Sequence, residues 1–150
     1  MSAPTGMPGI PGRFVVDASV AIKWFVPEIH ADAARRLLRE GVTLLAPDLI
    51  WAEVANALWR KWRDRELSAE TVEGILNDFR RYQLRIYAGE SLYDVAWPVA
   101  RGSGRTFYDS LYLALAMSNG CLMVTADLRF YNAIKDTTWS RYCLWVENVS

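Results

Sequence analysis

Two short apolar runs in this sequence each end in a hydroxyl and a carboxylate, residue types that can bind a cation or activate water. The run FVV leads into Asp17 and Ser19, and the run CLMV leads into Thr125 and Asp127. Short runs with no polar face are typical of buried strands in a parallel sheet, whose ligands bind at the carboxyl ends. A single aspartate in this position often only caps the next helix. The question is therefore whether other acids reach the same place.

Two further carboxylates occupy helical positions. Glu53 lies in an otherwise apolar stretch, and Asn56 and Arg60 share its face at about 100° per residue. A carboxylate in a buried helix is costly unless it is paired or binds a metal, so a contact with Asn56 or Arg60 and a metal-binding role are both open. Asp109 opens a stretch that is apolar all round, three residues after Thr106. This spacing fits a capping box, and the helix dipole favours an anion there, so capping alone would explain Asp109.

The elements that must position these acids alternate between strand-like and helix-like patterns along the chain. We expect strands at 14–16, 42–46, 84–87, 121–124 and 142–146, and helices at 20–26, 30–40, 49–65, 68–83, 90–100, 106–119 and 128–134. Pro98 should interrupt or bend the helix at 90–100. This alternation predicts an α/β fold, a three-layer α/β/α sandwich with a central parallel sheet of four to five strands. Residues 1–12 should form a flexible tail, and residues 13–150 a single domain.

In such a sheet the four acids should gather at one edge. Asp17 and Asp127 follow two strands, Asp109 opens the helix that leads into the second strand, and Glu53 can point the same way. Four close carboxylates repel one another, and a divalent cation removes that repulsion. Oxygen ligands without histidine or cysteine favour Mg²⁺, for which Mn²⁺ can substitute. Such metals act mostly on phosphate oxygens, so the pattern indicates hydrolysis of a phosphodiester by metal-activated water.

The composition argues against several other functions. The 150 residues carry 17 basic and 17 acidic side chains, which disfavours a broad electropositive surface for coating nucleic acid. The single histidine, His30, stands at an expected helix start and disfavours a Ser-His-Asp hydrolase. No glycine-rich phosphate-binding motif is present, which disfavours use of nucleoside triphosphates. No apolar run reaches the ~18–20 residues that a membrane span needs.

The residues around the acids also resemble the PIN-domain family, and most closely the VapC-type toxins of type II toxin–antitoxin (VapBC) systems. The similarity extends from about residue 14 to 146 and rests on four motifs in order. They are VDASVAIKWFVPE at 16–28, APDL at 46–49 with EVANAL at 53–58, YDSLYLALA at 108–116, and VTAD at 124–127. Two features depart from the family pattern: the first residues form a longer tail than usual, and Pro98 should break the helix before the third motif.

The resemblance implies a Mg²⁺-dependent endoribonuclease that is homodimeric and inhibited by a VapB-like antitoxin inserted into its active-site groove. A cytoplasmic location is expected from Cys121 and Cys143, which lie in apolar, strand-like runs and are typical of buried thiols in a reducing compartment. The catalytic and metal-binding acids would be Asp17, Glu53, Asp109 and Asp127, with Asp17 and Asp109 as the most direct ligands. Polar residues that the family tends to keep beside the acids, and that would support them, are Ser19, Asn56 and Thr125.

Other interpretations stay open at this stage. The RNA backbone could be held by a basic residue, and the candidates, each of which could equally be a plain surface charge, are Lys23, Arg60, Arg105 and Arg129. A receiver domain would need a lysine at a late strand end, and a dehalogenase-type phosphatase would need Asp-x-Asp after the first strand; neither pattern occurs. A catalytically weak PIN-fold module that only binds RNA or a protein is the remaining alternative.

Overall fold

A five-stranded parallel sheet forms the centre of the computed structural model, which describes residues 12–150. The strands are β1 (Arg13–Val16), β2 (Thr43–Pro47), β3 (Leu84–Tyr87), β4 (Leu122–Thr125) and β5 (Cys143–Trp145), in the spatial order β3-β2-β1-β4-β5. The predicted strands all form, within one or two residues of the expected bounds. The predicted flexible tail falls on residues 1–11, which lie outside the described residues, and on Gly12.

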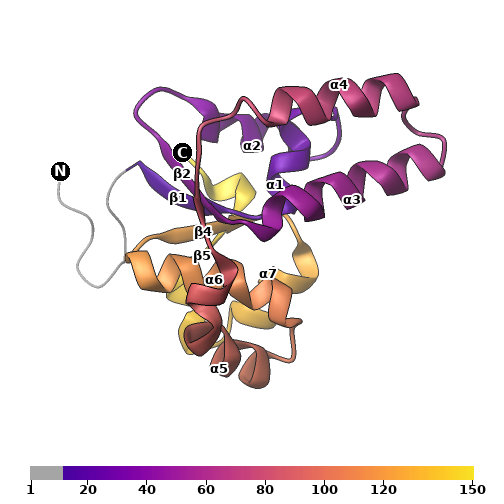
Figure 1. Cartoon of the computed structure of the whole chain (residues 1–150). Helices are drawn as coiled ribbons and strands as arrows, with labels where there is room; N and C mark the ends of the chain where they lie inside the picture. Colours follow the sequence, from indigo (N-terminus) through magenta and orange to yellow (C-terminus); the bar gives the residue numbers. More distant parts are fainter. Residues whose placement is uncertain (1–11) are drawn as a thin grey trace.

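Helices cover both faces of this sheet. They are α1 (Ala18–Ala21), α2 (Ala31–Arg35), α3 (Leu49–Arg63), α4 (Ala69–Phe79), α5 (Tyr93–Ser103), α6 (Phe107–Asn119) and α7 (Leu128–Ile134), joined in places by short 3₁₀ helices at Ile22–Trp24, Arg36–Leu38, Gly89–Leu92, Thr138–Tyr142 and Val146–Asn148. Right-handed crossovers place α1 to α4 on one face and α5 to α7 on the other (Figure 1). The predicted three-layer α/β/α sandwich is confirmed.

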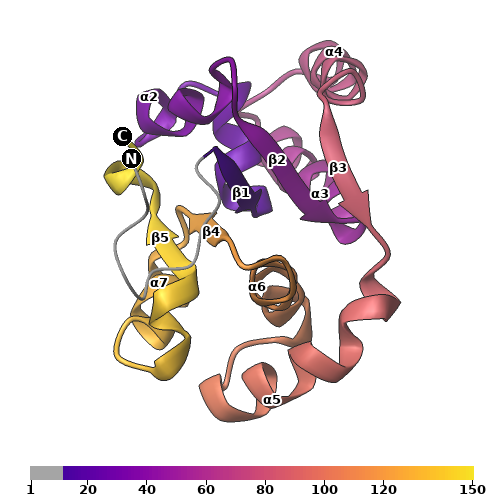
Figure 2. The same ribbon diagram turned by 90° about the vertical axis from the view of Figure 1, so that its left-hand side faces the viewer.

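The core is centred on β1, β4 and α6. Val15, Val16 and Val124 are fully buried because their strands are covered on both faces. The middle of α6 is buried on every side, as its lack of a polar face predicts, and Figure 2 shows this helix end-on beneath the curved sheet. No helix in the described part of the chain is long and apolar enough to cross a membrane.

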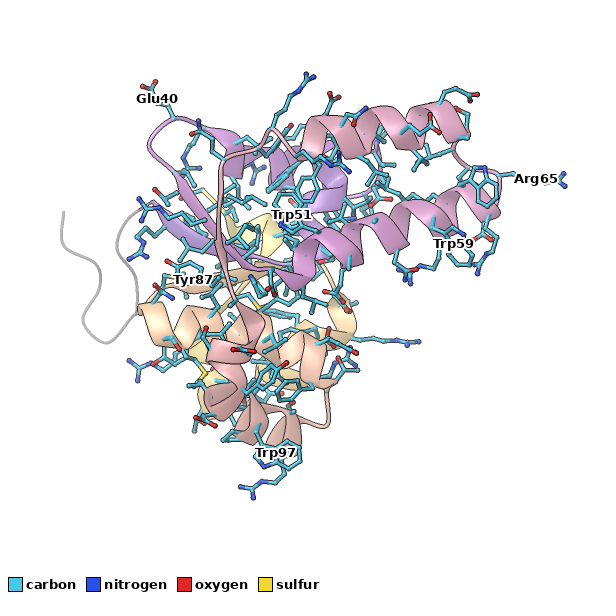
Figure 3. The ribbon with its side chains drawn as sticks, viewed as in Figure 1. Glu40, Trp51, Trp59, Arg65, Tyr87 and Trp97 are labelled. Carbon is cyan, nitrogen blue, oxygen red and sulfur yellow. The ribbon has the colours of Figure 1, made fainter. Side chains whose placement is uncertain are left out.

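Helix α3 is less buried than its sequence indicates. Its buried side is a single stripe at four-residue spacing, made of Ile50, Val54 and Leu58. Trp59 and Trp62 are each 48% exposed, and α3 and α4 form an arm that projects beyond the sheet, with Trp59 far along it (Figure 3). The apolar stretch around Glu53 therefore forms a helix that is buried along one side only. Apolar residues at many positions of a helix do not specify a covering layer for each of them.

Pro98 does not interrupt its helix, so the predicted break does not occur. Helix α5 runs without interruption from Tyr93 to Ser103 and contains Pro98 in its interior. A proline removes one backbone hydrogen bond from a helix, and burial of Ala96 and Val99 offsets part of that loss. The helix ends at Gly104, which has a φ of 71° that favours glycine.

The strand order creates one edge suited to a site. Strands β1 and β4 are neighbours, but the chain leaves them in opposite directions: β1 leads to β2 on one side, and β4 leads to β5 on the other. In open α/β sheets, ligands bind at the carboxyl ends of strands where the connections diverge in this way. Asp17 directly follows β1, and Asp127 lies two residues after β4.

Candidate active site

The four predicted acids line one cavity of about 620 Å³ at this edge of the sheet. They come from four separate places in the fold: Asp17 from the end of β1, Glu53 from α3, Asp109 from the first turn of α6, and Asp127 from the loop after β4. Of the polar residues expected to support the acids, Ser19 and Asn56 also line the cavity. Thr125 is completely buried and contacts Asp17.

Asp17 is the most enclosed of the four acids. Its Oδ1 accepts hydrogen bonds from the Ser19 hydroxyl at 2.6 Å and from the backbone N–H of Val20 at 3.1 Å, and its Oδ2 accepts one from the Thr125 hydroxyl at 2.5 Å. The bond from Val20 makes Asp17 the N-cap of α1. The two interpretations of Asp17 therefore do not exclude each other, because the same carboxylate caps a helix and faces the cavity.

The charge on Asp17 is destabilised in this position. Burial raises the pKa of its carboxyl group to about 6, against the opposing effect of the bonds from Ser19 and Thr125, and the negative charge of Asp127 raises this pKa further. A carboxylate held in such surroundings gains from a nearby cation.

Asp127 is joined to Asp17 through Thr125. The Thr125 oxygen donates to Asp17 and accepts from the backbone N–H of Asp127 at 3.1 Å. The Asp127 Oδ1 caps α7 by accepting from the backbone N–H groups of Arg129 and Phe130, at 3.0 and 3.2 Å. The Ser19 hydroxyl similarly accepts from the N–H of residue 126 at 2.9 Å. The ends of β1 and β4 are thus tied together by side chains.

Asp109 is paired with a neighbouring arginine. The Thr106 hydroxyl accepts from the Asp109 N–H at 3.0 Å and caps α6, as its spacing predicts. The Arg105 Nη2 donates to the Asp109 Oδ2 at 2.9 Å and lies 3.9 Å from the Asp127 Oδ2. Burial raises the pKa of the Asp109 carboxyl group, although the Arg105 charge acts in the opposite direction. Arg105, one of the four candidates for holding RNA, therefore contacts two of the acids.

Glu53 is held by a residue that the sequence pattern did not single out. The Tyr112 hydroxyl donates to its Oε1 at 2.6 Å, whereas the anticipated partners were Asn56 and Arg60. Burial raises the pKa of Glu53, and the nearby charge of Asp109 raises it further. Tyr112 belongs to the stretch of α6 that was interpreted as purely apolar. The signal that could have identified it is its position three residues after Asp109, on the same face of the helix.

The other basic residues considered for RNA binding lie in different surroundings. Glu28 accepts from Lys23 at 3.0 Å and from Lys61 at 2.9 Å, so Lys23 is already paired. Arg60 lines the cavity and is exposed to solvent. Arg129 donates its backbone N–H to Asp127 in the cap of α7. Of the four basic candidates, Arg60 is the one that both lines the cavity and is exposed.

The donor set has the chemistry of a site for a hard divalent cation. It consists of carboxylate oxygens, and three of these acids have pKa values raised by burial and by neighbouring negative charge. Within residues 12–150, however, no three acidic, histidine or cysteine side chains converge closely enough to enclose an ion. Asp109 is turned toward Arg105 instead.

Comparison with known proteins identifies the family. The PIN domain family model matches residues 14–135. The chain belongs to the PIN-domain family. Ribonuclease VapC3 of Pyrobaculum aerophilum is 31% identical over 117 residues, which cover 77% of this chain and 89% of that relative. The resemblance inferred from the four motifs is thereby confirmed, and this PIN-domain chain is related to named VapC ribonucleases.

Solved structures show the same PIN fold. The crystal structure of PAE2754 from Pyrobaculum aerophilum matches with a TM-score of 0.67 at 23% identity, and the match covers 97% of this chain and 92% of that one. The structure of Mycobacterium tuberculosis VapC20, described as a toxin that cleaves the sarcin-ricin loop, matches with a TM-score of 0.60 at 17% identity, over 81% and 95% of the two chains. At these identities the structural likeness concerns the fold.

Proposed function

We propose that this PIN domain is the toxin of a VapBC-type toxin–antitoxin pair, an endoribonuclease that hydrolyses RNA phosphodiester bonds with Mg²⁺. The observation that carries the proposal is the convergence of Asp17, Glu53, Asp109 and Asp127 on one cavity, from four elements of a chain related to VapC ribonucleases. Acids gathered in this way are costly for a protein that has no use for a cation.

The protein's own residues would bind and orient the cation and keep its oxygen ligands in place. When bound, Mg²⁺ would neutralise charge on the phosphate and lower the pKa of a water molecule. Asp17 and Asp109 are the proposed direct ligands, with Glu53 and Asp127 binding directly or through water. Ser19 and Thr125 would hold Asp17 in one orientation through their hydroxyl groups. Arg60, at the rim, would contact a phosphate of the RNA backbone.

The partners follow from the same assignment. We propose a VapB-like antitoxin that inserts a segment into this cavity, an association of the protein with itself as a homodimer, and a cytoplasmic location. The alternative is a PIN-fold module that binds RNA or protein with little catalysis. The presence of all four acids in one cavity favours the enzyme.

Cleavage of structured RNAs by the purified, antitoxin-free protein tests the proposal. With Mg²⁺ or Mn²⁺ we expect defined fragments, and with EDTA none. Asp17→Asn should slow cleavage by about 100-fold or more, which corresponds to about 3 kcal/mol of transition-state stabilisation. Asp32→Asn is the matched control, because Asp32 is a fully exposed carboxylate in α2.

The outcome separates the two candidate functions. Cleavage that persists in EDTA, or that is equally fast in Asp17→Asn, would exclude the proposed mechanism. RNA binding without cleavage in either metal would favour the binding module. Light scattering of the same preparation measures whether the protein is a dimer.

A further inference from the structure

The four acids differ in what holds them. In the described part of the chain, Asp17 accepts from three donors, Asp127 accepts from two backbone N–H groups, and Asp109 pairs with Arg105. For Glu53 the structure gives one hydrogen-bond donor, the hydroxyl group of Tyr112. Glu53 and Asp109 are therefore each oriented by one side-chain partner, and for Glu53 that partner is a neutral hydroxyl group from another helix.

Tyr112 is well placed to fix Glu53. Its side chain is only 2% exposed, so its ring is held by the core and its hydroxyl position is determined by α6. Asp109 lies on the same face of α6, one turn earlier. One rigid helix therefore supplies both an acid of the cavity and the donor that orients an acid from another helix.

The bond also determines what Glu53 can offer to a ligand. The hydroxyl donates to Oε1 at 2.6 Å, which is short for an O–H···O bond and typical of a charged acceptor. Within residues 12–150 the structure gives no hydrogen bond to Oε2, so Oε2 is the oxygen without a protein partner. The tyrosine thus turns a carboxylate with two equivalent oxygens into a ligand with one defined oxygen.

We propose that Tyr112 is a positioning residue of the active site, which orients Glu53 so that a single oxygen is presented to the divalent cation. This inference rests on the proposed function and names a residue that acts through another. Residues of this kind typically change metal affinity or activity by about 10–100-fold when their polar group is removed.

Metal binding by Tyr112→Phe tests the inference directly. The substitution removes one oxygen and keeps the ring, so we expect the fold to persist, as judged by circular dichroism. The affinity for Mn²⁺, measured by calorimetry without RNA, should fall by about tenfold. In cleavage assays kcat should fall and KM for RNA should stay the same. Tyr82→Phe is the control, because the Tyr82 ring stacks on Trp24 at 5.4 Å and does not line the cavity.

A double-mutant cycle shows whether Tyr112 acts through Glu53. If it does, Tyr112→Phe should lower Mn²⁺ affinity in the wild-type background and have no effect in a Glu53→Ala background. An equal effect in both backgrounds, or a Mn²⁺ affinity within twofold of wild type in folded Tyr112→Phe, would overturn the inference. Failure of the proposed function looks different, because then the wild-type protein itself would neither bind Mn²⁺ nor cleave RNA.

A second measurement covers the case in which Tyr112→Phe does not fold. In wild-type protein labelled with ¹³C at the tyrosine ring carbon that bears the hydroxyl, the Tyr112 signal reports its hydrogen bond. Glu53→Ala should shift this signal, whereas addition of Mg²⁺ to the wild-type protein should leave the hydrogen bond intact. Loss of the bond on addition of Mg²⁺ would contradict a positioning role.

Discussion

The strand side and the helix side of this site are built differently. On the strand side, Asp17 and Asp127 follow adjacent strands and are linked through the buried hydroxyl of Thr125. On the helix side, Glu53 and Asp109 project from two helices, and their side-chain partners are Tyr112 and Arg105. The strand side is held by several bonds that connect backbone and side chains, and the helix side by single side-chain contacts.

This difference assigns separate tasks to the two sides. The strand side is part of the core, so its contacts should contribute to the free energy of unfolding. They should also hold the ligands of the cation in fixed positions. On the helix side each acid is held by one side-chain contact, so removing that contact should leave the sheet undisturbed. We therefore expect substitutions on the strand side to alter folding, and substitutions on the helix side to alter metal binding at nearly constant stability.

The largest expected effect is the pH dependence that Asp17 gives to the metal-free protein. Its pKa is about 6 when folded and 3.8 when exposed, so the folded state binds the proton more tightly. The contribution to the free energy of unfolding is therefore highest below pH 4 and falls as the pH rises to about 6. Between pH 4 and pH 7, the free energy of unfolding of the wild type should therefore fall by about 3 kcal/mol more than that of Asp17→Asn. Urea unfolding at each pH measures this difference.

The comparison with Asp17→Asn removes the contributions of other groups. Glu53 and Asp109 also have raised pKa values, but they titrate in both proteins and cancel in the difference. At pH 7, saturating Mg²⁺ should stabilise the wild type more than the variant. If the free energy of unfolding depends on pH in the same way in both proteins, the pKa of Asp17 is not raised by folding.

Much of the strand side could be predicted from the sequence. The two apolar runs predict buried strands of one parallel sheet, so the hydroxyl and carboxylate after each run are expected at the same edge. That β1 and β4 are neighbours comes from the structure. The family resemblance implied that Ser19 and Thr125 support the acids, and the structure places both in contact with Asp17. Local patterns suffice here because the sheet brings the ends of β1 and β4 together whatever the surrounding helices do.

The helix side was less predictable, because helix periodicity predicts which face of a helix a residue occupies but not which residue of another helix it contacts. The face of Glu53 suggested Asn56 or Arg60 from its own helix, but the contact comes from Tyr112 on α6. Arg105 was considered for binding RNA, yet it pairs with Asp109. Likewise, the apolar circumference of α3 could not show that Trp59 and Trp62 lie on an exposed arm. Each of these depends on how separate helices pack.

The next effect concerns the hydroxyl that joins the two strand-side acids. Thr125→Val keeps the β-branched shape in β4 but leaves Asp17 Oδ2 and the Asp127 N–H without this partner. Unsatisfied buried groups cost about 1–3 kcal/mol, so the free energy of unfolding should fall by about 2 kcal/mol. Chemical denaturation measures this change. Thr43→Val, at a half-buried position of β2, is the control and should be nearly neutral. An equal fall in the free energy of unfolding in both variants would show that the hydroxyl of Thr125 does not stabilise the link between the two acids.

The smallest effect on stability, and the sharpest contrast, is expected for Arg105→Gln on the helix side. The Arg105–Asp109 pair is about one quarter exposed at both ends, and partly exposed ion pairs contribute roughly 0–1 kcal/mol. The free energy of unfolding should therefore change by less than about 1 kcal/mol.

Metal binding should nevertheless become tighter, because the arginine no longer competes for Asp109 and no longer lies 3.9 Å from Asp127. The shift in melting temperature caused by Mg²⁺ should be larger than in the wild type, and Arg101→Gln, at an exposed position of α5, should leave that shift unchanged. If Arg105→Gln instead weakens Mg²⁺ binding, the arginine supports the arrangement of the acids, and the helix side is as fixed as the strand side.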